Sequence, residues 1–438
     1  MKKLTLAFLI FEVLACSTLA TAETQLTDTL ELPGIFGESG VSLGVNVTAD
    51  TVISISDALG LAISRNPLVG IARARITAAQ GRLQQSGYRP NPEFSAEVED
   101  FGRGEKSSPA QTTIGVEQPF ELFGKRGARQ AVAEAELSAE RYLAQQPLLD
   151  LYQSVTITFV SALGAGASFS LTRQRLDLSR KIEEAVGTKV ADGAVPKAEL
   201  LRAQSTTKLA EIELSTAEAI AAQHRLALAS LWGSAESGFR VEGSLDDWLI
   251  SESTSTREFQ IEDNPELASL REQVRARNAE IRLAKATGKP DVSLGAGYRR
   301  LHDEGSNAFL VWAAIPLPFF NRNQGGVAEA VARLSQSEAE LAATRQRIVG
   351  EISQLLVLAK VQRKQVSVLR EQVIPPAQEA MEEIDFAYRL GSQPYINVLD
   401  AQRTLSELQS VIDALVAGAR STAEIEQLIG HRLSPVRR

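Results

Sequence analysis

The chain repeats its own pattern at a constant offset of 198 residues. The segment "DGAVPKAELLRAQ" at 192–204 aligns with "LGSQPYINVLDAQ" at 390–402, so that Gly193 matches Gly391 and Pro196 matches Pro394. The same offset places the Asn-Pro pair at 66–67 on the pair at 264–265. Prolines and glycines that match in the same order, almost without gaps, indicate a tandem duplication of a unit of about 200 residues, which is too long for a solenoid repeat.

Each copy contains the same series of predicted elements. A helix of moderate length comes first, at 56–87 in copy one, where Ser56 or Asp57 can cap its first turn, and at 263–288 in copy two. Two short segments of alternating polarity follow. A very long helix, a tight turn and a further helix complete each copy.

The two very long helices are predicted at 126–187 and 324–389. In the second, apolar residues recur every seven positions in two series: Leu334, Leu341, Ile348 and Leu355, and Ile352, Ala359, Val366 and Val373. Sustained heptads predict coiled-coil packing, and an aromatic content of only 5% agrees with long helices packed closely. At 1.5 Å per residue, about 60 residues make a rod of roughly 90–100 Å. Pro375 and Pro376 are expected to interrupt this rod locally.

Four segments, at 91–101, 111–120, 290–300 and 308–318, alternate between apolar and polar residues. Each has about 9–11 residues, the length of a tilted transmembrane β-strand. Aromatic residues gather near their ends, as in the interfacial girdle of a membrane barrel: Tyr88, Phe101, Phe120, Phe123, Phe319 and Phe320. In the fourth segment, Leu310 and Trp312 interrupt the polar face.

Two interpretations of these segments are possible. They are either two soluble hairpins packed on helices or membrane strands. The charges on the polar face favour membrane strands, and so does the commitment of the helices to coiled-coil packing. Four strands cannot close a barrel, and an open edge in lipid leaves backbone groups unsatisfied. The chain must then oligomerise: two copies give eight strands and a filled interior, and three give twelve and room for water.

The N-terminus carries an export signal. "MKK", a short apolar run and "ATA" ending at Ala22 form a signal peptide at 1–22. Cys16, the only cysteine, lies within "VLACS", which is similar to a lipoprotein signal. The cysteine is therefore either an acylated first residue or part of a leader cut after Ala22, and in both cases no internal disulfide can form.

Several function classes are excluded or weakened by the residues present. A net charge of −8 without a block of Lys or Arg argues against a nucleic-acid partner. The three histidines lie on different elements, "GKRG" at 124–127 lacks the other residues of a phosphate-binding loop, and no catalytic constellation, metal site or cofactor site is expected. The uncharged stretch at 151–172 is long enough to span a membrane, but its many Ser, Thr and Gly residues predict a helix packed on other helices.

The duplicated plan, the "DALGLAISRNP" opening and "YRLGSQPYINVLDAQRTL" at the second turn resemble the TolC-type outer membrane factors of bacterial efflux systems over nearly the whole mature chain. "YRPNPEFSAEVEDFG" and "EQPFELFGKRGAR" are most similar to the heavy-metal, CzcC-like branch. The resemblance implies a mainly α protein with a small transmembrane β part. Its trimer would form a twelve-stranded barrel in the outer membrane of a Gram-negative bacterium and a helical barrel across the periplasm.

The resemblance also implies a function and partners. The chain would be the passive channel of a tripartite efflux system, working with a periplasmic adaptor and an inner-membrane RND pump and exporting heavy-metal cations. The alternative is a periplasmic coiled-coil adaptor or scaffold without a membrane barrel. Adaptors have a single hairpin rather than two copies with strands inside, and a scaffold leaves the alternating strands without a purpose.

The expected domains follow from the two copies. A signal peptide at 1–22 and an N-terminal extension at 23–53 precede the first repeat at 54–233, whose hairpin tip lies at 188–196. A connecting segment at 234–262 leads to the second repeat at 263–430, with its tip at 389–395, and a tail at 431–438 ends the chain.

By the same resemblance, the two tips dock the adaptor, through Gly193, Pro196, Arg389, Leu390, Gly391 and Pro394. Each glycine allows the turn, and each proline is expected just inside the next helix. Two acidic residues are expected to face the threefold axis at the periplasmic aperture. They match Asn397 and Asp400, with Glu199 and Arg202 equivalent in copy one. Asn397 departs from the acidic pattern, and Asp400 could instead be an ordinary solvated residue.

Overall fold

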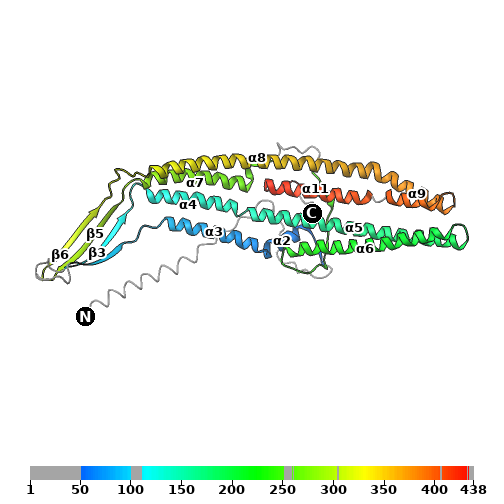
Figure 1. Cartoon of the computed structure of the whole chain (residues 1–438), viewed down its shortest axis with the longest axis horizontal. Coiled ribbons are helices and arrows are strands. Elements are labelled where there is room, and N and C mark those ends of the chain that lie inside the picture. Colours follow the sequence, from blue (N-terminus) through cyan, green and yellow to red (C-terminus); the bar gives the residue numbers. More distant parts are fainter. Residues whose placement is uncertain are drawn as a thin grey trace. The chain divides into compact units, whose positions relative to one another are not determined.

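A computed structural model describes residues 51–99, 111–250, 259, 261–302, 305–404, 407–431 and 433. The predicted signal peptide at 1–22, Cys16, Phe101 and all but the end of the extension at 23–53 lie outside these residues, as does most of the tail at 431–438. The chain divides into two compact units, and Figure 1 labels the helices and strands that they contain. Of the described residues, those within 72–144 and 272–335 belong to the strand unit, and those within 51–71, 145–271 and 336–433 belong to the hairpin unit.

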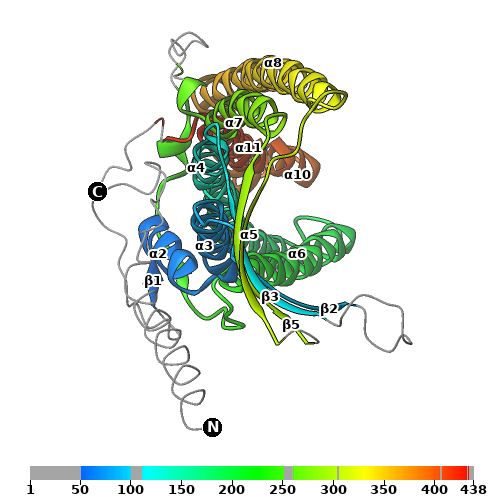
Figure 2. The same cartoon turned by 90° about the vertical axis from the view of Figure 1, so that its left-hand side faces the viewer.

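The strand unit is built on a four-stranded antiparallel sheet. Its strands are β2 (Glu93–Glu99), β3 (Gln111–Phe120), β5 (Val292–Leu301) and β6 (Asn307–Ala314), in the order β2-β3-β5-β6. Figure 2 shows β2, β3 and β5 side by side. The two copies of the repeat therefore meet at the centre of one sheet, where Gly115 of β3 lies opposite Gly297 of β5.

The fourth strand is shorter than the sequence predicts. It ends at Ala314, whereas the expected strand runs to 318. Pro316 and Pro318 explain the difference, because a proline has no N–H to donate to a neighbouring strand. Ile315 and Leu317 are therefore exposed residues beyond the strand.

The helical part of the strand unit consists of α4 (Lys125–Leu143), most of α3 (Pro67–Ser86) and α7 (Pro265–Thr287), and the start of α8 (Gln324–Val368). Ala72, Ile76 and Ala79 of α3 pack with Leu137 of α4 in one apolar cluster. The Asn323 side-chain amide donates a hydrogen bond to the Ala284 carbonyl at 2.8 Å and so connects the α8 entrance to α7.

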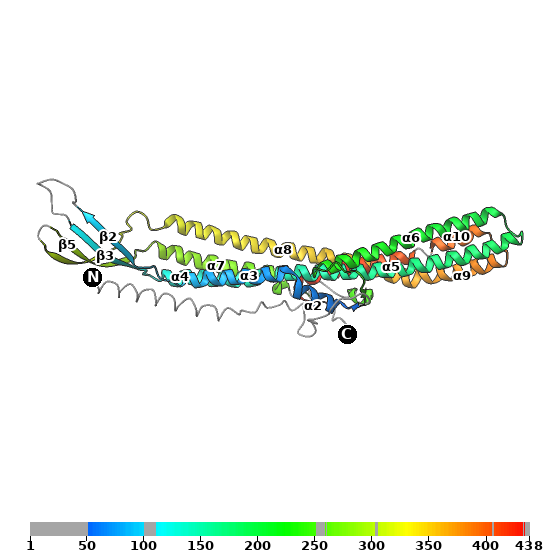
Figure 3. The ribbon, with the colours of Figure 1, turned by 90° about the horizontal axis from the view of Figure 1, so that it is seen from below.

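The hairpin unit contains two long helical hairpins (Figure 3). The first pairs α5 (Gln146–Ala191) with α6 (Lys197–Ser230), and the second pairs α9 (Ile374–Arg389) with α10 (Tyr395–Thr404). Helices α2 (Ile55–Arg65) and α11 (Glu407–Ile429) pack on α5. Short 3-10 turns lie at Leu245–Trp248 and Ile261–Asp263, and β1 (Val52–Ile53) pairs in parallel with β4 (Arg240–Val241).

Four of the eight heptad residues are buried core residues of the hairpin unit. Ile348, Ile352 and Ala359 are buried together with Ile425 and Ile429 of α11, and Val366 is buried with Val411 and Leu415. The predicted coiled-coil face of this helix is therefore the face that packs, and burial of such side chains stabilises the unit by roughly 1.5–3 kcal/mol each.

Both predicted rods are interrupted at prolines. The first is divided into α4 and α5 at Ala144 and Gln145, because Pro147 cannot donate the helical hydrogen bond to Leu143. The second passes through a π-helical turn at Leu369–Val373, directly before Pro375 and Pro376. The predicted interruption at these two prolines is thus present as a change of hydrogen-bond pattern.

The first helix begins earlier than the sequence predicts and is also divided. Ser54, rather than Ser56 or Asp57, is the N-cap of α2, and Asp57 completes a capping box with it. Asn66 separates α2 from α3, because the residue before a proline disfavours the helical region.

Among the described residues, one helical stretch is long and apolar enough to cross a membrane, Lys125–Ala191, and half of its most apolar window is buried inside the protein. Tyr152, Phe159 and Val160 of this stretch are core residues. A Cβ at Gly164 would lie 2.4 Å from a Val416 methyl carbon, so α5 and α11 approach closely at this glycine. The predicted interpretation as a helix packed on other helices agrees with these contacts.

Candidate functional site: sheet faces and hairpin tips

One face of the four-stranded sheet is apolar, and none of the described residues covers it. Phe94, Val116, Ala296 and Val311 form one row across the four strands, and Ala96, Ile114, Tyr298 and Phe309 form the next. Phe309 is 89% exposed, Val311 86% and Phe94 72%. A contiguous apolar face of this kind marks contact with a membrane or a partner.

The opposite face is mostly polar. One of its rows contains Glu93, Glu117, Gly295 and Trp312, and another contains Glu97, Thr113, Arg299 and Ala308. The Arg299 Nε atom donates a hydrogen bond to the Thr113 hydroxyl at 3.0 Å. Within the described sheet, β2 and β6 are the edge strands, so the sheet remains open in a single chain.

Exposed aromatic residues surround one end of the sheet. Tyr88, Phe120 and Phe123 precede or follow the first two strands, and Phe319 and Phe320 follow β6; all five are at least two-fifths exposed. The Lys289 ammonium lies 5.0 Å from the centroid of the Phe123 ring. Five of the six aromatic residues that the sequence assigns to a girdle therefore lie near one end of the sheet, and the sixth, Phe101, is not described.

The two hairpin tips have the same turn, as the repeat predicts. Gly193 and Gly391 adopt left-handed φ angles of +70° and +81°. At the first tip, the Gly193 and Ala194 N–H groups donate to the carbonyls of Val190 and Lys189. The equivalent donors in copy two, 198 residues later, are Gly391 and Ser392, with Tyr388 and Ala387 as acceptors. Each turn satisfies the last carbonyls of the incoming helix in the manner of a Schellman motif.

The prolines of the tips lie one position earlier than expected. Pro196 is the N-cap of α6, with an extended ψ of 146°, and the helix proper begins at Lys197. Pro394 likewise directly precedes α10. Both prolines, like Arg389 and Leu390, are exposed, and Leu390 is 70% exposed. Arg389 forms an ion pair with Asp385 at 2.7 Å.

A contact between the two tips was not predicted from the sequence. Lys189 of the first hairpin donates a hydrogen bond to the Tyr388 carbonyl, and its ammonium lies 4.1 Å from the centroid of the Tyr388 ring. The Tyr388 ring lies 5.9 Å from that of Tyr395. Both tyrosines are buried with Ile182 and Val186 of α5 in one cluster that joins the hairpins.

Burial and charge act together on Tyr388. Desolvation raises the pKa of the Tyr388 phenol to about 12, and the Glu199 carboxylate and Tyr395 add to the effect. Among the described residues, neither the Tyr388 hydroxyl nor the buried Glu199 Oε2 atom has a hydrogen-bond partner. The charge of Glu199 therefore favours the neutral form of the Tyr388 phenol.

The four expected aperture residues occupy different environments. Asn397 and Glu199 are half-buried, whereas Asp400 and Arg202 are exposed. The Asn397 side-chain amide donates to the Gln393 side chain. Asp400 lies beside Arg403, with 3.8 Å between the carboxylate and guanidinium groups.

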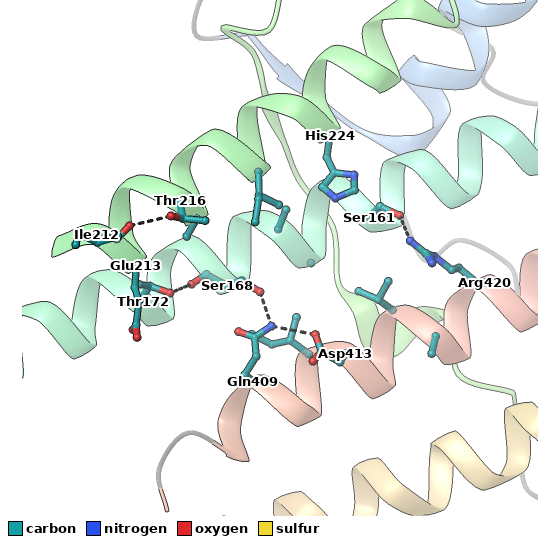
Figure 4. A pocket seen from close by; sticks show the side chains of 17 residues that line it. Ser161, Ser168, Thr172, Ile212, Glu213, Thr216, His224, Gln409, Asp413 and Arg420 are labelled. Carbon is teal, nitrogen blue, oxygen red and sulfur yellow. Dashed lines mark hydrogen bonds between the residues drawn. The ribbon is translucent and has the colours of Figure 1, made fainter. Parts of the chain in front are cut away.

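A cavity of about 610 Å³ lies between α5, α6 and α11 (Figure 4). Gln409 crosses it to donate hydrogen bonds to the Ser168 hydroxyl and the Asp413 carboxylate, each at 2.9 Å. The Arg420 guanidinium donates to the Ser161 hydroxyl at 2.9 Å. Burial lowers the pKa of His224, and the Arg420 charge lowers it further.

The described residues contain no group of three His, Cys, Asp or Glu side chains that could hold a metal ion. His224 borders the cavity, and His302 shares a 3.0 Å hydrogen bond with the Thr112 hydroxyl at the end of the sheet. His431 contacts the Ile429 carbonyl. The three histidines are therefore on separate elements, as the sequence indicates.

The fold and its amphipathic sheet define a class of protein. The family model described as "Outer membrane efflux protein" matches residues 58–234 and 260–431, and the chain therefore belongs to this family. It is a channel protein of the outer membrane of Gram-negative bacteria, in a family of transporters rather than enzymes.

Particular relatives are similar in sequence and in fold. The cobalt-zinc-cadmium resistance protein CzcC of Cupriavidus metallidurans is 28% identical over 384 residues, covering 86% of this chain and 90% of that protein. The nickel-cobalt-cadmium resistance protein NccC of Alcaligenes xylosoxydans xylosoxydans is 24% identical over 284 residues, 64% of each chain. A crystal structure of CusC superimposes with a TM-score of 0.74 at 19% identity, covering 92% of this chain and 98% of that one.

Proposed function

We propose that this outer membrane efflux protein is the homotrimeric outer membrane channel of a tripartite RND-type system. The main support for a trimer is the open sheet of the strand unit. Its outer face is apolar over two full rows, and its edge strands β2 and β6 have unused hydrogen-bonding sides within the described chain. Joining β6 of one copy to β2 of the next satisfies both edges, and three copies give a closed barrel of twelve strands with a water-filled interior.

The cargo we propose is heavy-metal cations. The relatives CzcC and NccC are named for resistance to cobalt, zinc, cadmium and nickel, which supports a metal substrate for this chain. A passive duct must release what enters it, so the channel is expected to guide cations by wall charge rather than by tight ligands. The charges on the polar sheet face support guidance of cations, because this face carries the carboxylates of Glu93, Glu97 and Glu117 as well as the Arg299 guanidinium.

The hairpin tips are proposed to meet the periplasmic adaptor. The exposed surfaces of Gly193, Pro196, Leu390 and Pro394 lie at matched turns of the two copies. Three chains would present six similar tips, two from each chain. An adaptor could therefore bind the tip of either repeat by the same kind of contact. Asn397, Asp400, Glu199 and Arg202 are proposed to border the aperture that these tips surround.

Two measurements test the proposal. Purified protein should migrate as a heat-modifiable trimer from the outer membrane fraction, whereas a periplasmic adaptor or scaffold would be found in the soluble fraction without heat modification. Disrupting the gene and scoring resistance to Zn, Co, Cd, Ni, Cu and Ag tests the cargo. Unchanged resistance to all six metals would contradict the metal substrate and leave the channel assignment intact.

A further inference from the structure

Trp312 lies flat on a seat of three glycines on the polar face of the sheet. A Cβ built at Gly295 would lie 2.1 Å from the indole, at Gly115 2.7 Å and at Gly297 3.2 Å. The first two distances are too short for real atoms, and the third is tight; a Cβ at Gly297 would also lie 2.8 Å from the Ile114 carbonyl oxygen. The ring therefore occupies the space that side chains of two neighbouring strands, β3 and β5, would otherwise fill.

The indole also reaches across a whole strand. Trp312 of β6 is opposite Gly295 of β5, and Gly295 is opposite Glu117 of β3. The indole Nε1–H donates a hydrogen bond of 2.7 Å to the Glu117 carboxylate. A side chain at Gly295 would stand between the two partners, so the glycine is required for this bond as well as for the flat ring.

Glycine weakens a strand, since it has no side chain to pack and loses more backbone freedom on folding. Three glycines at adjacent positions of one sheet therefore need an explanation. Covering them with an aromatic ring restores some packing, but one tryptophan on a polar face could do so in any orientation that buries it. The hydrogen bond to Glu117 selects the flat orientation.

We propose that Trp312 faces the lumen of the barrel and that its glycine seat holds the ring against the wall, so that the water path stays open and Glu117 is fixed as a wall charge. The inference rests on the proposed trimeric barrel with the polar face inward. Three copies of the indole would line one level of the barrel. A ring displaced from its seat would project into the lumen at each of them.

The first experiment measures single-channel conductance of the purified full-length protein in planar bilayers. Gly295→Ala displaces the ring and is expected to lower conductance roughly twofold, because pore diameter controls flow. The double variant Gly295→Ala with Trp312→Ala has no ring to displace and should recover at least the wild-type value. Gly127→Ala is the matched control, since nothing lies within 4 Å of a Cβ at that helical position.

The second experiment does not depend on the glycine variant assembling. Cys16 is the only cysteine of the chain, so wild-type protein provides the background for a water-soluble thiol reagent. Trp312→Cys should react and show reduced conductance, and Val311→Cys, the adjacent residue on the apolar face, should not.

The outcomes separate this inference from the proposed function. The proposal that Trp312 faces the lumen and is held against the wall by the three glycines is overturned by either of two results. One is unchanged conductance of Gly295→Ala, and the other is reaction at position 311 but not at 312. Equal reaction at both positions, or a wild-type protein that forms no channels, contradicts the barrel itself.

Discussion

The Asn66 side-chain amide donates a hydrogen bond to the Leu231 carbonyl at 2.8 Å, and so connects the start of α3 to the end of α6. Its carbonyl oxygen accepts from the Leu68 N–H at 3.0 Å. Asn264 repeats the arrangement in the second copy, with 2.7 Å to the Leu428 carbonyl and 2.9 Å from the Leu267 N–H. The repeated Asn-Pro pair is therefore a joint between the first and last helices of each copy.

The two joints should differ in their contribution to stability. Asn264 is 3% exposed, whereas Asn66 is half-buried. Asn264→Ala leaves a buried carbonyl and N–H without partners and should lower the free energy of unfolding by about 1–3 kcal/mol. Water can replace the amide at the more open Asn66, so Asn66→Ala should cost less. Thermal unfolding of the two purified variants tests this order, and equal melting temperatures would contradict it.

The apolar and polar sheet faces should respond oppositely to charge. Leu294→Arg places a cation on the proposed lipid face, at a cost of about 2–4 kcal/mol near mid-bilayer. Assembly of the heat-modifiable trimer in the outer membrane should therefore fail. Ser293→Arg, one residue earlier on the opposite face, should assemble normally. Val98→Arg and Glu97→Arg form a second pair with the same expectation, and tolerance at all four positions would refute the face assignment.

The sequence predicted the strands and turns well because local patterns encode them. Alternation identifies the two faces of each strand, and Gly193 and Gly391 identify turns that need a left-handed residue. Pairing between strands is not a local property. The sequence could not show that Gly115 lies opposite Gly297. For that reason Trp312 was interpreted as an interruption of the polar face and not as a ring that covers glycines on it. The one feature of the sequence that could have indicated this packing is the presence of glycine at Gly115, Gly295 and Gly297, all on the polar face of the two central strands.

The contacts that join the tips were missed for a related reason. Lys189 and Tyr388 belong to different copies and approach only when the hairpins pack, so neither residue has a recognisable pattern of its own. The cation beside Asp400 was also not predicted from the sequence. Arg403 lies about one helical turn away from it on the same helix, where a spacing of three brings side chains together.

Alkaline pH should loosen the packed tips through Tyr388. The pKa of Tyr388 is raised to about 12 in the folded protein, above the ordinary value of 10.0. The folded state thus favours the neutral phenol. The resulting contribution to the free energy of unfolding is fully present below pH 10 and is lost as the pH rises through about 12. Tyr388→Phe should remove that part of the pH dependence. It should cost little at neutral pH, because the buried hydroxyl has no hydrogen-bond partner among the described residues. Unfolding of wild type and variant between pH 9 and 12 is the measurement, and parallel curves would contradict the assignment.

The last prediction concerns the proposed aperture. Three copies of Asp400 around one axis would concentrate negative potential in a narrow, water-filled throat, which favours cations and binds polyvalent ones. Two features weaken this field: Asn397 is uncharged, and the Arg403 guanidinium lies 3.8 Å from the Asp400 carboxylate. Both members of this pair are exposed, so it is screened and easily broken. The channel should therefore show weak cation selectivity in planar bilayers.

Charge changes at this level should move selectivity in opposite directions. Asp400→Ala should abolish the cation preference, while Asn397→Asp and Arg403→Ala should each strengthen it and lower the concentration of trivalent cation needed for block. Arg202→Ala removes a positive charge from the same proposed aperture but leaves the Arg403 partner of Asp400 in place, so it should act in the same direction as Arg403→Ala with a smaller effect. A larger effect of Arg202→Ala than of Arg403→Ala would make the copy-one arginine the neutralising group. Unchanged reversal potential and block in Asp400→Ala would place Asp400 on an ordinary solvated face and remove it from the aperture.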